Sequence, residues 1–425
     1  MLSLAFIVGM FLFSFLREDY LTIRQIYYSG VYFSLVSAFW LLLFFISHLY
    51  DLPYLANHKN FFKLLLKLFL GGCLGLCFIL LVMLPQEISY SFLILLIVVS
   101  LGFLIIWRIF YNIILSHWSL KIILISQAPE AEFLEEYLQN HPQYGYRVVK
   151  NLSGANIDKC FKELQDNQSK GLLVLVADKN FLTLIKDKDS LVANLWSLES
   201  FDNFYEAITG RVALSYITEE WFQEYVFSRN KRFYEAVKRA NDLFFGLLLL
   251  IISMPIWLLA SILILIDSGK PILFQSTRVG KGGKEFKIYK FRTMVLNASL
   301  VGPSWTLEND ERITKFGAFL RKTHLDEVPQ VLNIINGTMS FVGPRPEEKS
   351  LVAIFKAAIP FYEKRLLIKP GVIGWAQINF PHTASIEEAR EKLTYDFYYL
   401  KQRNLLLDWV VAIKAWRIPF DVPTH

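Results

Sequence analysis

Cysteine is scarce in this chain of 425 residues, and the three present, Cys73, Cys77 and Cys160, form no disulfide framework. The seven histidines do not pair with cysteine at metal-site spacing, which argues against a zinc protein. Charged residues make up only 19% of the chain, against a hydrophobic fraction of 54%. This balance excludes an ordinary soluble protein and predicts an integral membrane protein.

The net charge of +6 is small and dispersed. It argues against nucleic-acid binding and fits contact with anionic lipid headgroups and nucleotide phosphates.

Four apolar runs in residues 1–117 predict a bundle of transmembrane helices, at 2–16, 31–48, 64–84 and 91–114. His58, Lys59 and Lys63 mark the second loop as cytoplasmic, whereas Arg17 and Arg24 argue mildly for the opposite orientation. The runs contain almost no ionisable residues, so we interpret the bundle as an anchor rather than a transport path.

Residues 118–217 alternate between strand and helix patterns. Strands are expected at 121–126, 146–150 and 172–177, with a helix at 130–139, which predicts a doubly wound, Rossmann-like domain. The first strand-to-helix turn, 126–131, has no glycine to bring backbone close to a pyrophosphate. We therefore expect a degenerate domain that binds no dinucleotide and has a structural or regulatory role.

Residues 218–237 mix charged and aromatic side chains, a pattern that fits a linker or a helix at the membrane surface. The apolar run that follows, 243–266, is long enough to span a bilayer. Ser253 and Pro255 interrupt its middle, where proline removes a helical hydrogen bond. A proline-kinked spanning helix and a helix that turns back are both compatible with this pattern.

The stretch 321–330 contains two adjacent carboxylates, Asp326 and Glu327, between basic residues and a proline. Neighbouring side chains in a helix diverge by about 100°, so we expect the two to perform different tasks rather than to contact one group together. Phosphate-binding cations are expected nearby, because short motifs rich in basic residues and glycine lie on both sides, at 275–280, 290–294, 309–314, 337–346 and 369–377. Two prolines around Arg345 would hold that residue in place.

In these motifs and their order, residues 238–419 resemble the monotopic phosphoglycosyl transferases, bacterial sugar transferases that start glycan assembly on a polyprenyl phosphate. The preceding layout looks like the large subfamily, which adds four membrane helices and a nucleotide-fold-like domain. The resemblance implies a re-entrant membrane helix that bends at Pro255. One departure is Thr338, where the family usually has an acidic residue, and we assign that position no metal-binding role.

The resemblance also implies roles for single residues. Asp326 would be the nucleophile that forms an aspartyl-phosphosugar, and Glu327 would be a Mg²⁺ ligand. The cations that would bind the substrate phosphates are Lys290, Arg292, Arg312 and Arg345.

The expected fold is a membrane protein of the α plus α/β class. A four-helix bundle and a degenerate Rossmann-like domain precede a mainly α-helical catalytic domain, 238–425, which a re-entrant helix anchors. Near its end, 405–420 is expected to form an apolar helix in the membrane interface, with Lys414 and Arg417 on it.

The expected reaction moves a sugar 1-phosphate from a UDP-sugar to polyprenyl phosphate, with release of UMP, at the cytoplasmic face of the bacterial inner membrane. The product would start an exopolysaccharide, capsule or O-antigen. The expected partners are these two substrates and inner-leaflet lipids, and the oligomeric state, including a homo-oligomer, stays open. Glucose, galactose and their N-acetylated or deoxy relatives all fit as the sugar. The alternatives are a processive membrane glycosyltransferase and a non-catalytic scaffold for polysaccharide assembly.

Overall fold

The structure is a computed structural model that describes residues 119–126, 128–152, 172–176, 196–227, 231–296, 310–380 and 385–415, together with Ile106 and Phe110. The chain divides into two compact units, Met1–Phe204 and Tyr205–His425. The four predicted membrane helices, apart from Ile106 and Phe110 of the fourth, lie outside the described residues, as does the C-terminal part of 405–420 with Arg417.

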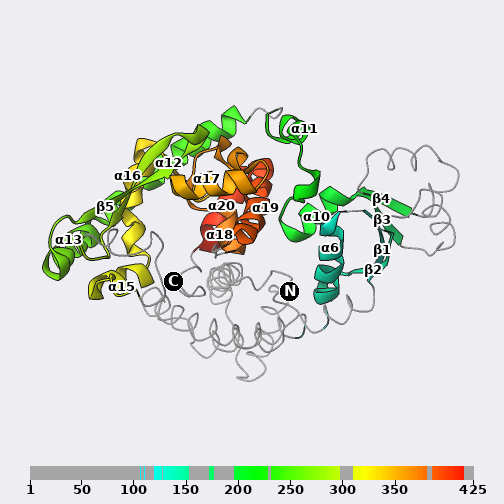
Figure 1. Ribbon diagram of the computed structural model, residues 1–425, viewed down its shortest axis with the longest axis horizontal. Helices are drawn as coiled ribbons and strands as arrows, with labels where there is room; N and C mark the ends of the chain where they lie inside the picture. Colours follow the sequence, from blue (N-terminus) through cyan, green and yellow to red (C-terminus); the bar gives the residue numbers. More distant parts are fainter. Residues whose placement is uncertain are drawn as a thin grey trace, which may run out of the picture. The chain divides into compact units, whose positions relative to one another are not determined.

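The first unit contains a four-stranded parallel sheet with the order β2-β1-β3-β4. Its strands are β1 (Leu120–Ile125), β2 (Tyr146–Asn151), β3 (Leu172–Val176) and β4 (Trp196–Ser200). Helix α6 (Pro129–Asn140) lies next to the sheet (Figure 1) and buries Ala131, Leu134 and Leu138. The predicted alternation of strand and helix is confirmed. Strand β1 is apolar and lies at the centre of the sheet, as expected for a buried strand of a parallel sheet.

The second unit begins earlier than the expected boundary after residue 217. Helix α10 (Phe201–Thr209) runs across the division, and Val212 donates its amide to the carbonyl of Thr394, 3.1 Å away. The stretch 218–237, expected to be a linker or a helix at the membrane surface, contains several short elements. That region holds α11 (Glu219–Phe222) and the π-helix η3 (Gln223–Phe227), before α12 begins at Arg232. Trp221 and Phe222 are buried in the main core of this unit, because their aromatic surface packs against protein rather than lipid.

The apolar run 243–266 is broken near its middle, as Pro255 predicted. Helices α12 (Arg232–Ile252) and α13 (Met254–Ser268) meet at Ser253 with a bend of 56°. The Ser253 hydroxyl donates to the carbonyl of Leu250, 3.3 Å away, which gives a partner to one backbone group at the bend. No single helix among the described residues is long and apolar enough to cross a membrane, and this bent pair passes that test only when its two helices are joined.

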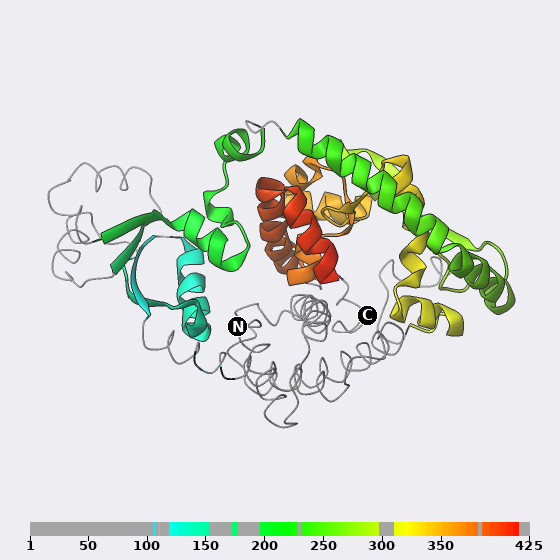
Figure 2. The same cartoon turned by 180° about the vertical axis from the view of Figure 1, so that it is seen from behind.

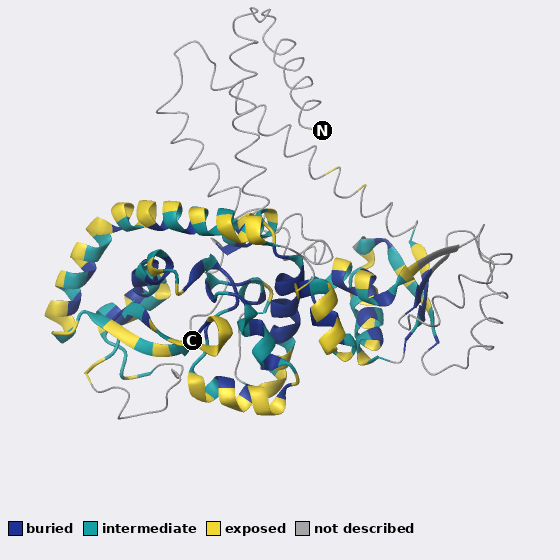
Figure 3. Cartoon of the chain, turned by 90° about the horizontal axis from the view of Figure 1, so that it is seen from above, coloured by how far each residue is buried: buried dark blue, intermediate teal, exposed yellow. Residues whose placement is uncertain are grey.

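Both helices of the pair carry exposed apolar residues along their length (Figure 3). These include Phe244, Ile251 and Ile252 on α12, and Leu258 and Ile266 on α13.

The remaining elements surround the stretch with the two carboxylates. A hairpin of β5 (Leu273–Val279) and β6 (Glu285–Phe291) is followed by α15 (Lys315–Lys322), the 3-10 helix η5 (Leu325–Gln330) and α16 (Val331–Asn336). The short strands β7 (Ser340–Val342) and β8 (Gly371–Ile373) pair in parallel. They pack with the elements that complete the core, α17 (Lys349–Ala358), η6 (Tyr362–Leu367), α18 (Trp375–Asn379), α19 (Ile386–Gln402) and α20 (Leu405–Ala415) (Figures 1 and 2).

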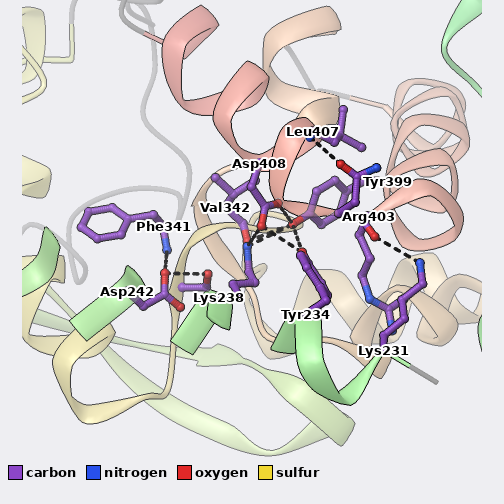
Figure 4. A network of polar contacts seen from close by, with 12 residues as sticks. Lys231, Tyr234, Lys238, Asp242, Phe341, Val342, Tyr399, Arg403, Leu407 and Asp408 are labelled. Atoms are coloured by element: carbon purple, nitrogen blue, oxygen red, sulfur yellow. Dashed lines mark hydrogen bonds and ion pairs between the residues drawn. The ribbon is translucent and has the colours of Figure 1, made fainter. Parts of the chain in front are cut away.

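A polar network attaches α12 to this core (Figure 4). Asp408 of α20 accepts hydrogen bonds from Tyr399 at 2.6 Å, from Lys238 at 2.7 Å and from Tyr234 at 2.9 Å. The helix expected at 405–420 is confirmed over its described part, α20. Its Lys414 is buried, 6.0 Å from the centre of the Trp375 ring.

Candidate active site

The two carboxylates lie in η5, a tight 3-10 turn that local sequence produces. Thr314 caps the start of α15 by accepting the amide of Gly317 at 3.0 Å, and α15 ends after Lys322. His324 then adopts a left-handed conformation with φ of 56°, which reverses the chain before η5. Pro329 lies inside η5, where its ring constrains the backbone.

Asn333 of α16, the helix that follows η5, holds η5 beside strand β6 through two hydrogen bonds. Its side-chain amide donates to the carbonyl of Lys287 at 2.7 Å and accepts the amide of Tyr289 at 3.1 Å. Lys290, the next residue of the strand, therefore lies opposite the carboxylates.

Lys290 contacts both carboxylates. Its Nζ is 2.7 Å from Glu327 Oε1 and 3.9 Å from Asp326 Oδ2. The two contacts are unequal, since only the one to Glu327 is within hydrogen-bond distance. Arg345 lies on the other side of Glu327, with Nη2 3.1 Å from the same Oε1 atom.

The electrostatics differ between the two acids. Burial raises the pKa of Asp326, and Lys290 opposes this rise only in part. Burial also raises the pKa of Glu327, but Lys290 and Arg345 outweigh it and hold that pKa well below its usual value. Glu327 is thus a firmly ionised carboxylate bound by two cations. Asp326 accepts no hydrogen bond on its side chain within the described part of the chain, so its oxygens are available to a substrate.

Two of the predicted phosphate-binding cations are engaged elsewhere. Arg292 donates from Nη2 to the Ser268 carbonyl at 2.7 Å and to the Ser268 hydroxyl at 3.0 Å, at the C-terminal end of α13. A guanidinium in this position complements the negative end of the helix dipole. Arg312 binds Asp310 through Nε at 2.8 Å and through Nη2.

Two other arginines interact electrostatically with the acids, and sequence reasoning assigned neither of them a role. Arg321 lowers the pKa of Asp326 and donates from Nε to the Thr293 hydroxyl at 2.9 Å. Burial lowers the pKa of Arg278, which Glu327 opposes weakly, and Arg278 forms an ion pair with Glu348 at 3.0 Å. Arg321 lies in the stretch 321–330 and Arg278 in the motif 275–280, but chain spacing offers no rule for choosing among the cations of these segments.

The two carboxylates of the site suit a hard metal cation whose remaining ligands come from a bound phosphate compound. Nowhere in the described ranges do three or more His, Cys, Asp or Glu side chains form a group that could hold a metal ion. A metal at this site would take one or two carboxylates plus phosphate oxygens, the ligand set that Mg²⁺ accepts. Thr338 takes no part, since its hydroxyl donates to the carbonyl of Asn333 at 3.1 Å.

Comparison with known proteins connects this geometry to a chemistry. The family model "Bacterial sugar transferase" matches residues 233–421. The chain is 36% identical over 212 residues to the UDP-N-acetylgalactosamine-undecaprenyl-phosphate N-acetylgalactosaminephosphotransferase of Aeromonas hydrophila, a match that covers 50% of this chain and 49% of that protein.

Two further relatives each match 40% of the chain. The exopolysaccharide production protein PSS of Rhizobium leguminosarum bv. phaseoli is 38% identical over 178 residues, which is 40% of this chain and 89% of that protein. The UDP-glucose:undecaprenyl-phosphate glucose-1-phosphate transferase of Escherichia coli (strain K12) is 35% identical over 174 residues, covering 40% of this chain and 38% of that protein. The chain thus spans about half the length, or less, of the Aeromonas and Escherichia relatives.

Proposed function

The chain belongs to the bacterial sugar transferase family, and from this we propose that it transfers a sugar 1-phosphate from a UDP-sugar to polyprenyl phosphate, releasing UMP. One observation carries the proposal. A buried aspartate whose side chain accepts no hydrogen bond from the described residues lies next to a glutamate that two cations hold ionised. The names of two relatives give undecaprenyl phosphate as the acceptor and UDP-sugars as the donors, which supports the same substrate classes here.

In the proposed first step, an Asp326 oxygen attacks the phosphorus that carries the sugar. The bond from this phosphorus to the bridging oxygen breaks, and UMP leaves with that oxygen. In the second step a phosphate oxygen of the lipid attacks the same phosphorus, and the bond to Asp326 breaks. The carboxylate is restored, and the lipid diphosphate sugar is the product.

Lys290 and Arg345 have two functions in this scheme. They keep Glu327 ionised, and they place positive charge beside the position where the transferred phosphoryl group would lie. Glu327 would hold a Mg²⁺ ion, which supplies charge neutralisation of the pyrophosphate when bound. Arg292 keeps Nε and Nη1 without a partner among the described residues, whereas Arg312 would have to loosen its contacts with Asp310 to bind phosphate through Nε or Nη2.

We also propose that this site works at the cytoplasmic face of the bacterial inner membrane. The exposed apolar residues of α12 and α13 support a re-entrant helix pair that enters the inner leaflet. The lipid phosphate would then lie at headgroup level, within reach of a site that takes its UDP-sugar from the cytosol.

The test is to incubate the purified chain with a panel of UDP-sugars and Mg²⁺ and to measure UMP release. Without lipid acceptor, mass spectrometry should find one phosphosugar added to a peptide containing Asp326, and Asp326→Asn should abolish both the adduct and turnover. Turnover without any adduct, with kinetics that fit a single ternary step, would overturn the two-step mechanism.

A further inference from the structure

The segment Gly343-Pro344-Arg345-Pro346 presents Arg345 to Glu327 although it belongs to no helix or strand. Pro344 and Pro346 have no amide hydrogen, so few backbone donors are available to hold the segment. Arg345 precedes a proline and is restricted to extended backbone conformations. With few amides in the segment, its carbonyls are the backbone groups by which other elements can hold Arg345 in place.

Three carbonyls of this segment and its continuation are held by donors from other elements. Gly371 donates its amide to the Pro344 carbonyl, and Val279 donates its amide to the Glu347 carbonyl, both at 3.0 Å. The Arg345 carbonyl accepts from Nη2 of Arg365, also at 3.0 Å. Of these three donors, Arg365 is the one that uses a side chain.

The Arg365 guanidinium is itself held on two other sides. Asp396 of α19 accepts from Nε at 2.8 Å, and the same Oδ2 atom forms an ion pair with Nη2 at 2.8 Å. The Tyr362 hydroxyl accepts from Nη1 at 3.2 Å. The side chains of Arg365 and Asp396 are 4% and 2% exposed, so the pair is sealed from water. A buried ion pair of this kind is weak evidence for stability, because apolar side chains of similar volume often serve equally well.

We propose that Arg365 and Asp396 are positioning residues, which orient Arg345 toward Glu327 through its backbone carbonyl. The inference rests on the proposed function, since its readout is turnover. Arg365 suits the task because a planar fork can bind a carboxylate and a carbonyl at once, whereas lysine offers a single ammonium.

The chain offers a matched control. Lys401 and Glu206 also form a buried ion pair, at 2.8 Å, with side chains 3% and 4% exposed. Lys401 lies on α19, as Asp396 does, and its Nζ is 4.0 Å from the centre of the Tyr225 ring. The described partners of this pair belong to α10, α11 and η3, and not to the segment of Arg345.

The experiment compares two double variants of the full chain in lipid nanodiscs. Arg365→Met with Asp396→Leu removes the positioning pair, and Lys401→Met with Glu206→Leu removes the control pair without leaving a buried charge. We expect the first to lower kcat for UMP release by about ten- to a hundredfold, because small displacements of a group at the site have effects of this size. The control should stay within about twofold of wild type, and thermal unfolding reports whether each variant is folded.

A second comparison distinguishes a positioning effect on Arg345 from a general disturbance of the fold. In an Arg345→Ala background, removing the positioning pair should change kcat by less than about twofold, since the side chain that it orients is gone. Equal losses with and without the Arg345 side chain would overturn the proposal, as would wild-type turnover by the folded positioning variant. If that variant does not fold, Arg365→Lys replaces it, and wild-type turnover by Arg365→Lys overturns the proposal equally. Absence of UMP release from the wild-type chain would instead contradict the proposed function.

Discussion

At the residue scale, the candidate site depends on how closely Lys290 and Arg345 approach each of the two neighbouring acids. Glu327 receives both cations, whereas Asp326 receives Lys290 at the longer distance of 3.9 Å. The pKa values of the two acids are consequently shifted in opposite directions. This separation suits a pair in which one acid reacts and the other stays a fixed charge.

Replacing Lys290 should move the pH dependence of catalysis. Burial raises the pKa of Asp326 and Lys290 lowers it, so Lys290→Met should raise that pKa further. The nucleophile must be ionised, and activity is therefore lost as the pH falls through this pKa. The acid limb of the kcat/KM profile should shift to higher pH by roughly one unit. Lys287→Met is the control, because Lys287 is exposed on the same strand, and an unchanged acid limb in Lys290→Met would refute the assignment.

Replacing Glu327 should destabilise the chain in a pH-dependent way. Its pKa in the folded chain lies below the unfolded value of about 4.3, so its stabilising contribution is complete above that value and is lost as the pH falls below it. Glu327→Gln should cost about 1–3 kcal/mol at neutral pH and flatten the decline of Tm in acid. Glu285→Gln, which breaks the exposed pair with Lys349, should cost less than about 1 kcal/mol. Equal losses of Tm for the two variants would contradict this reading.

At the element scale, the bent pair α12–α13 is attached to the catalytic core by polar side chains at its N-terminal end. Arg239 donates to the carbonyls of Ile334 and Ile335, at 2.6 and 2.7 Å, and so caps the end of α16. Asp242 accepts from the Ser340 hydroxyl and the Phe341 amide, both at 3.1 Å (Figure 4). The helix that meets the membrane in our proposal is thus also part of the scaffold that supports η5.

The proposed re-entrant topology places both ends of the pair on one side of the membrane. Single cysteines at Phe233 and Lys270, both exposed, should be labelled together in a chain without its native cysteines. An impermeant thiol reagent should miss both in intact cells and react with both once the cytoplasmic face is opened. Labelling of Lys270→Cys from outside would show that the pair spans the bilayer.

At the scale of the whole molecule, the catalytic unit includes residues that the sequence had assigned to the preceding domain. Glu206 pairs with the buried Lys401, and Gly210 accepts the indole N–H of Trp375 at 2.8 Å. Val212 and Ile217 belong to the main core. A catalytic fragment therefore has to begin before these residues.

We expect a fragment of residues 205–425 to fold and release UMP. A fragment of 218–425, which begins at the expected boundary after residue 217, loses Glu206 and leaves Lys401 buried without that carboxylate, at a cost of about 3–5 kcal/mol. Thermal unfolding and UMP release in detergent compare the two fragments, and Lys401→Met should restore part of the stability of the shorter one. Equal stability of the two fragments would show that residues 205–217 are dispensable.

The sequence by itself determined the features that depend on neighbours along the chain. Buried apolar runs predicted β1 and β3, which lie at the centre of the parallel sheet, and the strand pattern at 146–150 predicted the edge strand β2. Pro255 predicted the break between α12 and α13, because proline inside a continuous helix removes a backbone hydrogen bond. The order of short motifs identified the family, and the comparisons confirm it.

Only the tertiary structure decided which cations meet the two acids. Lys290 lies 37 residues before Glu327 and Arg345 lies 18 residues after it, while Arg312 is nearer to Glu327 than either and binds Asp310 instead. Spacing along the chain could not distinguish them, because contact depends on how β6, η5 and the Gly343–Pro346 segment pack. The same reason applies to Arg365 and Asp396, which lie 31 residues apart in the chain. Nothing in their local sequence shows that Arg365 donates to the Arg345 carbonyl or that Asp396 accepts from Arg365, because both contacts form only in the folded core.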